Sequence, residues 1–451
     1  DKILRESPPD FSYYKDCFVY ILHLVTSINN RKKEEEIIKN KGFTPINKQL
    51  LQKRIYHYSK YINYLLDQNI LIENRQYIVG RKSRGLKFKD FYNSPIKKIM
   101  ITKYTLIKSI LTKKKTTNEE TRDNLAYLEQ WWNKSLTIDI EGATEYLRSL
   151  YLDEVNNYDI EFPLEIYNSR MIPVDRLFRN DYIFEVDNTA GRLHTWLTQV
   201  KSDLRKFVKY EGQTLCNIDI TNSQPYLAIS LLDQEVYSRN KMEERVISYN
   251  VNHKETVQKN KWITSTTGVN KYKTIDNNPI ILVKKFANEL HNKDVILYKE
   301  LVSKGIFYEE FGKILKENDN ITITNNVNYR SEAKSATFSA FFSPNTSISY
   351  KPEMKNFKQS FPTVYKIFSF YKKGKNQHNT LACSLQGLEA ELILHKICGR
   401  ISEEYPHIPL YTIHDSIVTT TNYSNCVKII MEEELEKAIG LKPQIKIEVW
   451  E

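Results

Sequence analysis

The chain has 451 residues, of which 41% are apolar, and this predicts a globular protein of two or three domains. Its formal net charge of +11 indicates a polyanionic partner such as a nucleic acid, and the longest early apolar run, residues 17–25, is too short to cross a bilayer. That run also lacks the layout of a signal peptide, and the five cysteines have no spacing typical of zinc ligands, so we expect a cytoplasmic protein without a zinc site or a disulfide framework.

The N-terminal part predicts helices followed by a basic-tipped hairpin. Residues 18–40 have the pattern of an exposed helix, and residues 49–67 carry an apolar stripe that predicts a second helix. Residues 70–72 and 76–79 favour strands, and the basic segment 81–85 follows them. A helix that leads into such a hairpin is the outline of a winged helix, in which the helix enters the major groove of DNA and the wing contacts phosphates.

Residues 1–95 resemble the winged-helix domains of replication-initiator proteins of plasmids and phages. The resemblance implies that this part binds duplex DNA, and a role in protein contacts is the alternative. Residues 96–185 are helical and charged, with a lysine run at 113–115 in a loop and two tryptophans, 131 and 132, in a core. The segment 139–141 (Asp-Ile-Glu) resembles the first motif of proofreading exonucleases, but there is no space for the rest of such a domain, so we interpret it as a turn.

The apolar run of residues 216–220 predicts a buried strand, and a carboxylate interrupts this run. Asp219 occupies a position where a purely structural strand would have Val or Ile. Burying an unpaired carboxylate costs several kcal/mol, so such a side chain usually has a cation or a metal ion as its partner. The segment 232–327 is rich in Asn and Lys, and its part 250–278 is polar and poor in apolar periodicity.

Two cations and two aromatic rings recur every four residues between positions 329 and 344, namely Arg330, Lys334, Phe338 and Phe342. On a helix these side chains form one face, with the cations at its N-terminal end. Cations bind a triphosphate and flat rings stack under a base. An ordinary amphipathic helix is the alternative interpretation.

Residues 411–418 predict a β-hairpin that holds Asp415 at its bend. Taken alone, this Asp has an alternative interpretation as a polar turn residue. If the hairpin lies beside the strand 216–220, Asp219 and Asp415 can share two Mg²⁺ ions about 3.5 to 4 Å apart, an arrangement typical of phosphoryl transfer. Residues 425–439 then predict a helix and residues 444–450 a closing strand.

Five short motifs resemble those of family A DNA polymerases, in the same order along the chain. Residues 219–224 (Asp-Ile-Thr-Asn-Ser-Gln) are similar to motif A, the four-residue stripe to the fingers helix, and residues 413–415 (Ile-His-Asp) to motif C. Residues 189–193 are similar to the primer-contacting segment, and residues 385–392 to the helix before motif C. The resemblance covers residues 187–420 and implies an α/β (α+β) right-hand polymerase.

The resemblance also implies domain boundaries. After the N-terminal domain (1–95), residues 96–185 would form a reduced thumb, 186–232 the first part of the palm, 233–344 the fingers with an insertion, and 345–451 the rest of the palm. The implied substrates are a DNA primer-template and nucleoside triphosphates, and the implied cofactor is a pair of Mg²⁺ ions, with Mn²⁺ as a substitute.

The resemblance assigns roles to eleven residues. Asp219, Asp415 and the carbonyl of Ile220 would bind metal, and Arg330 and Lys334 would bind the triphosphate. The nucleotide would also contact Phe338, Phe342 and Gln224, while the primer-template would contact Arg192, Gln386 and His414. Three of these have structural alternatives: Arg192 as a surface cation, Gln386 as an amide on a helix face, and His414 as a core histidine.

Three positions depart from the family pattern. Gln224 replaces a glutamate that excludes ribose, Phe342 replaces a tyrosine that can brace it, and Ser416 replaces a glutamate, as in single-subunit phage-type RNA polymerases. We expect a modest preference for dNTPs, because Gln224 is nearly as long as the glutamate but Phe342 lacks the tyrosine hydroxyl that could brace it. The first choice is a DNA polymerase of a phage or mobile element. The alternatives are an RNA polymerase or primase of the same superfamily, and a DNA-binding or defence protein with a degenerate polymerase fold.

Overall fold

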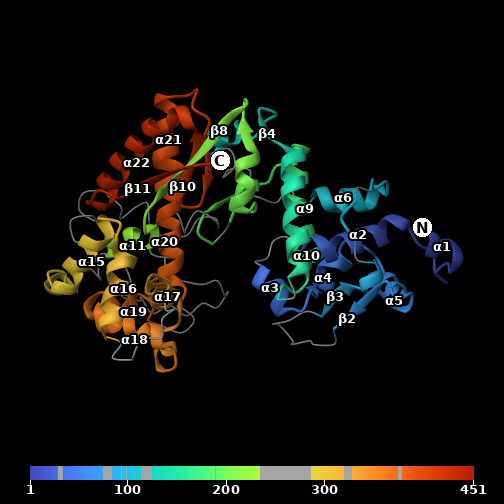
Figure 1. Cartoon of the computed structure of the whole chain (residues 1–451), viewed down its shortest axis with the longest axis horizontal. Coiled ribbons are helices and arrows are strands. Elements are labelled where there is room, and N and C mark those ends of the chain that lie inside the picture. The colour runs from blue at the N-terminus through green and yellow to red at the C-terminus, as the bar shows by residue number, and fades with distance from the viewer. Residues whose placement is uncertain are drawn as a thin grey trace, which may run out of the picture.

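The computed structural model describes residues 1–28, 34–74, 84–92, 94–97, 99–112, 124–157, 159–187, 189–233, 286–318, 328–373 and 378–451. The fold combines helices with antiparallel sheets, so the predicted mixed α/β class is confirmed. Figure 1 shows the largest sheet and its covering helices at one end of the molecule and the N-terminal elements at the other. Within the described ranges, no helix has both the length and the apolarity needed to cross a bilayer.

The N-terminal module packs its helices on a three-stranded sheet with the order β1-β3-β2. Its core is formed by apolar residues of helices α2, α4, α5 and α6 and strands β2 and β3, including Phe18, Ile21, Ile62, Leu65, Leu71 and Leu86. Its elements are α1 (Lys2–Glu6), α2 (Lys15–Ser27), α3 (Glu34–Lys39), β1 (Thr44–Pro45), α4 (Lys48–Gln52), α5 (Tyr58–Asp67), β2 (Leu71–Glu73), β3 (Gly85–Phe88) and α6 (Tyr104–Thr112).

Two helix predictions for this module need correction, and one strand prediction is not tested. The helix predicted over 18–40 is two helices, because α2 ends at Ser27 and α3 begins at Glu34. The helix predicted over 49–67 is also divided: the chain turns between α4 and α5, where His57 has a left-handed backbone with φ of 56°. The strand that pairs with β2 is β3, whereas the predicted strand 76–79 lies outside the described residues, as do the lysines at 113–115.

Two long antiparallel helices follow, α9 (Ile140–Asn156) and α10 (Pro163–Phe178), after the short α8 (Ala126–Glu129) and β4 (Leu136–Ile138). Figure 1 shows both long helices between the main sheet and the N-terminal module. A buried ion pair with 2.7 Å between Arg170 Nη1 and Glu154 Oε1 joins them. Asp139 is the N-cap of α9, since its Oδ1 accepts a hydrogen bond of 3.0 Å from the Gly142 amide, so our interpretation of 139–141 as a turn is wrong.

The main sheet has the order β4-β7-β8-β10-β9, and β11 pairs with β8. Its strands are β4, β7 (Val208–Tyr210), β8 (Gln213–Ile220), β9 (Tyr411–Ile413), β10 (Ser416–Thr420) and β11 (Ile445–Val449). Since side chains alternate along a strand, Ile218 and Ile417 point to one face, where they pack in the core with α22 (Ser424–Ile439), and Asp219 points to the other. Trp132 is buried in a second core beside β4, and a separate hairpin joins β5 (Phe184–Val186) to β6 (Leu193–Thr195).

The remaining helices pack around an aromatic core that includes Tyr298, Phe307, Phe311, Phe341, Phe357, Phe361 and Phe368. They are α11 (Ser223–Ala228), α15 (Lys293–Ser303), α16 (Phe307–Asn318), α17 (Tyr329–Phe342), α18 (Pro352–Ser360), α19 (Pro362–Tyr371), α20 (Thr380–Ala390) and α21 (Cys398–Glu404), with a π-helical segment, η9 (Glu391–Ile397), between the last two. Helices α18 and α19 pack on α15 to α17. Residues 352–371 therefore lie with the predicted fingers helices, although they belong to the range predicted as the rest of the palm. The polar segment 250–278 lies outside the described residues.

Short 3₁₀ turns connect these elements. They are η2 (Asp90–Tyr92), η4 (Trp196–Thr198), η5 (Ser202–Phe207), η6 (Ile229–Leu232), η7 (Ala287–Glu289), η8 (Asn345–Ser349) and η10 (Thr421–Tyr423). The turn η5 leads directly into β7, which carries the chain into the main sheet, and the site described next lies at the end of β8 in that sheet.

Candidate active site

The structure brings together the two carboxylates singled out in the sequence. Asp219 is near the end of β8, opposite Ser416 at the start of β10. Asp415 immediately precedes Ser416, in a two-residue turn that joins β9 to β10. The other residue of this turn is His414, whose backbone is left-handed with φ of 54°. The predicted strand and hairpin are therefore neighbours in one sheet, with both carboxylates at the same end.

The electrostatic environment of this pair disfavours two negative charges. Burial, together with the charges of Asp415 and Glu448, raises the pKa of Asp219 to about 7, while Lys446 opposes this rise. Burial also raises the pKa of Asp415, although Arg192 and Lys334 oppose this effect. A nearby cation would stabilise the doubly ionised pair. Glu448 and Lys446 belong to β11, which the sequence indicated only as a closing strand.

The donor set fits a hard divalent cation rather than a structural metal. Among the described residues there is no group of three or more His, Cys, Asp and Glu side chains that could hold a metal ion. Mg²⁺ is commonly bound by one or two carboxylates together with water and substrate phosphates, so Asp219 and Asp415 would suffice. Ile220 follows Asp219 as the last residue of β8, and its carbonyl remains a predicted third ligand.

Helix α17 carries the two predicted triphosphate-binding cations, and the charge of one of them, Lys334, acts on Asp415. It begins after Asn328, whose side chain accepts a hydrogen bond of 3.1 Å from the Ser331 amide and so caps the helix. Lys334 is exposed, and its charge favours the ionised form of Asp415. Arg330 is paired with Glu309 of α16, with 2.6 Å between Nε and Oε1. Two of the predicted nucleotide-binding residues thus lie on the face of α17 that is open to solvent.

The two phenylalanines of the stripe continue this face into the core. The ring centroids of Phe338 and Phe342 are 5.5 Å apart, and the Lys334 ammonium lies 5.7 Å from the Phe338 ring. Phe342 also packs edge-on against the buried Phe341, with centroids 6.0 Å apart. Both stripe rings are half-buried, so part of each ring surface is available to a ligand.

A single carboxylate shapes the predicted primer-contacting segment. Asp187 Oδ1 accepts hydrogen bonds from the amides of Thr189 and Ala190, at 2.7 and 2.8 Å. Its Oδ2 accepts one of 3.2 Å from the amide of Arg192 and lies 3.2 Å from the His194 ring nitrogen. Burial opposes ionisation, but these hydrogen bonds outweigh it and hold the pKa of Asp187 well below its ordinary range. Sequence reasoning did not identify Asp187.

The side chain of Arg192 reaches a buried glutamate that the sequence analysis also missed. Glu389, on α20, is 1% exposed, and its Oε2 accepts hydrogen bonds from Arg192 Nη2 at 2.7 Å and from Gln224 Nε2 at 2.6 Å. The pKa of Glu389 is raised to about 7, mainly by burial, and the Arg192 charge opposes this rise. Glu389 falls within the apolar positions of its helix, as Asp219 does in its strand, and that interruption is the signal by which it could have been found.

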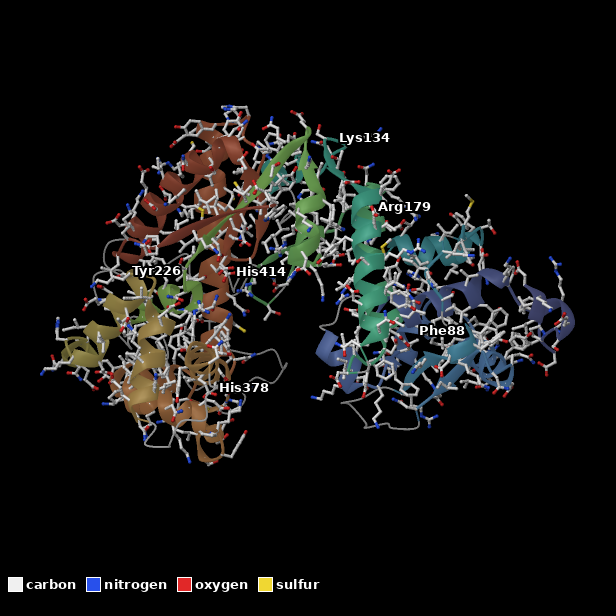
Figure 2. All side chains as sticks on the ribbon, in the orientation of Figure 1. Phe88, Lys134, Arg179, Tyr226, His378 and His414 are labelled. Carbon is white, nitrogen blue, oxygen red and sulfur yellow. The ribbon has the colours of Figure 1, made fainter. Side chains whose placement is uncertain are left out.

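Of the other predicted primer-template residues, His414 is the more constrained. Burial lowers the pKa of His414 to about 4, so the ring is neutral at physiological pH. Its Nδ1 is buried without a hydrogen-bond partner in the described structure, and its ring lies 5.9 Å from that of His194. Figure 2 shows His414 on the inner side of the sheet, near the middle of the molecule. Gln386 is half-buried on α20, one turn before Glu389.

Comparisons with known proteins yield similarity to solved structures alone. No protein-family model and no curated protein matches the chain. Among solved structures, the chain is similar to the polymerase domain of Pol1 from M. smegmatis, in complex with DNA primer-template and dNTP. The similarity covers 77% of this chain and 73% of that one, with 12% sequence identity and a TM-score of 0.34. At this level it assigns neither a family nor an activity.

Proposed function

We propose that this protein is a template-directed nucleotidyltransferase, with a DNA polymerase that extends a primer as the first choice. The observation that carries the proposal is the pairing of Asp219 and Asp415 at one end of the sheet, with the Lys334 cation of α17 close to Asp415. A carboxylate pair suits metal binding, and a neighbouring cation suits the phosphates of a nucleotide. The reaction is the attack of a primer 3′-hydroxyl on the α-phosphate of a nucleoside triphosphate, with release of pyrophosphate.

In this proposal, separate residues bind the metal and the triphosphate. Asp219 and Asp415 would hold Mg²⁺, which when bound lowers the pKa of the attacking hydroxyl and stabilises the charge that develops on the phosphates. Lys334 and Arg330 bind the triphosphate and neutralise the leaving group. The Arg330–Glu309 pair has side chains that are 56% and 43% exposed. Such a pair contributes little to stability, so a triphosphate can displace Glu309 from Arg330.

The test is incorporation of labelled dNTP or NTP on a primed and on an unprimed template, with Mg²⁺ and, separately, with Mn²⁺. The first choice predicts incorporation of dNTPs that requires a primer and is lost in Asp219→Asn. A preference for NTPs together with synthesis on an unprimed template would favour an RNA polymerase or primase instead. If the folded protein incorporates neither class of nucleotide, the proposal is wrong and a DNA-binding or defence role is favoured.

A second function is proposed for the N-terminal module, namely binding of duplex DNA as a winged helix. The supporting observation is its element order, α2-α3-β1-α4-α5-β2-β3, with the sheet order β1-β3-β2. Helix α5 buries Tyr61, Ile62 and Leu65 and exposes a polar face that carries Ser59, Lys60 and Asn63. A helix with such a face can enter the major groove.

The test for this module is salt-dependent binding of a DNA duplex by the full chain. Lys60→Ala and Asn63→Ala change only exposed side chains and leave the core of the module intact. Weaker duplex binding by both variants would support the proposal. Unchanged affinity and unchanged salt dependence in both would contradict it and favour a role in protein contacts.

A further inference from the structure

The buried Glu389 joins two residues that come from separate parts of the chain. Arg192 lies at the turn before β6 and Gln224 lies in α11, yet both donate to the same oxygen of Glu389, at 2.7 and 2.6 Å. With 1% exposure, this carboxylate has almost no access to water. A buried carboxylate that loses such donors is strongly destabilised, so the three side chains are held together as a unit.

The chemistry of these groups determines which way the Gln224 amide faces. The Glu389 oxygen that receives the Arg192 guanidinium acts as an acceptor, so Gln224 presents its NH₂ group to it. The amide oxygen, Oε1, must then face away from Glu389. It is buried and has no hydrogen-bond partner within the described ranges, as is also true of Arg192 Nε. Buried polar atoms are normally satisfied, so these atoms indicate a polar ligand next to Gln224 and Arg192.

We propose that Glu389 is a positioning residue for sugar selection, because it holds the Gln224 side chain in one orientation and ties it to Arg192. This inference rests on the proposed polymerase function. A free glutamine has many rotamers, and one whose amide nitrogen is held by a buried carboxylate resists displacement by a ribose 2′-hydroxyl. The brace that Phe342 lacks is thus supplied by α20, so the exclusion of ribose is tighter than the sequence analysis predicted.

The experiment compares the ratio of kcat/KM for dNTP to that for NTP in four proteins: the wild type, Gln224→Ala, Glu389→Leu and the double variant. Glu389→Leu is expected to lower the ratio by about two- to tenfold, the range that corresponds to one net hydrogen bond. The double variant should fall no further than Gln224→Ala, because both changes remove the same restraint. Glu389→Gln keeps the length and an acceptor oxygen, so its ratio should lie between those of the wild type and Glu389→Leu.

Glu154→Leu is the matched control, since Glu154 is also a buried carboxylate with an arginine nitrogen at 2.7 Å. It should lower the thermal unfolding midpoint without changing the ratio. If Glu389→Leu does not fold, the comparison of Glu389→Gln with the wild type decides the question. If the Glu389 variants keep the wild-type ratio while Gln224→Ala lowers it, the proposed role of Glu389 is wrong and the polymerase function still stands. Absence of any incorporation by the wild type overturns the polymerase function, and this inference with it.

Discussion

Replacing Asp219 by asparagine is expected to abolish nucleotide incorporation and, without divalent metal, to stabilise the protein at neutral pH. Burial, Asp415 and Glu448 raise the pKa of Asp219 from an ordinary 3.8 to about 7. Between these two values the folded chain keeps a proton that the unfolded chain has lost, so stability falls as the pH rises and the loss is complete above about pH 7. The difference between the two pKa values sets an upper bound of about 4 kcal/mol on the loss in free energy of unfolding. Screening at this partly exposed side chain reduces the expected loss to roughly 2 kcal/mol.

The assay is thermal unfolding in a chelator at about pH 5 and about pH 8, with and without Mg²⁺. The wild type should gain stability at the lower pH or with metal, whereas Asp219→Asn should gain less from either, because Asp415 and Glu389 still titrate. Asp16 provides a control of opposite sign, because hydrogen bonds from the amides of Thr102 and Lys103 outweigh burial and lower its pKa. Asp16→Asn should therefore destabilise the chain at neutral pH. The reasoning is refuted if Asp219→Asn is less stable than the wild type at about pH 8 without metal, or if it retains activity.

Three further changes test other parts of the site. Arg330→Ala and Lys334→Ala should each lower kcat/KM for the nucleotide by about 10- to 100-fold with little effect on template binding. The control Lys304→Ala, which removes an exposed cation paired with Glu300, should leave kcat/KM unchanged. Loss of template binding in the two α17 variants would instead make α17 a nucleic-acid surface. Gln224→Ala should reduce the preference for dNTPs in side-by-side incorporation, and an unchanged preference would remove it from sugar selection. Lys60→Ala should weaken duplex binding and lower the salt slope by about 1 without affecting extension of a short primed template; a parallel loss of extension would place Lys60 in the catalytic module.

The local elements of the site could be predicted because they depend on neighbours in the sequence. The strand with Asp219 and the hairpin with Asp415 follow from short apolar runs around a polar position. The stripe of α17 follows from a four-residue repeat, which is a property of any helix. The break between α4 and α5 could not be found in this way, because the apolar stripe continues across residues 53–57, where the chain turns and His57 has a left-handed backbone.

The type of each site element and the identity of the two central carboxylates can therefore be read from the sequence. The charges that surround these carboxylates depend on the fold. Glu448 and Lys446 affect Asp219 because β11 pairs with β8, although more than two hundred residues separate them in the chain. Glu389 meets Gln224 from a position 165 residues away. Hydrogen bonds and charge interactions act over a few ångströms in space, whereas a sequence pattern records only neighbours along the chain, so partners brought together by the fold leave no local signal.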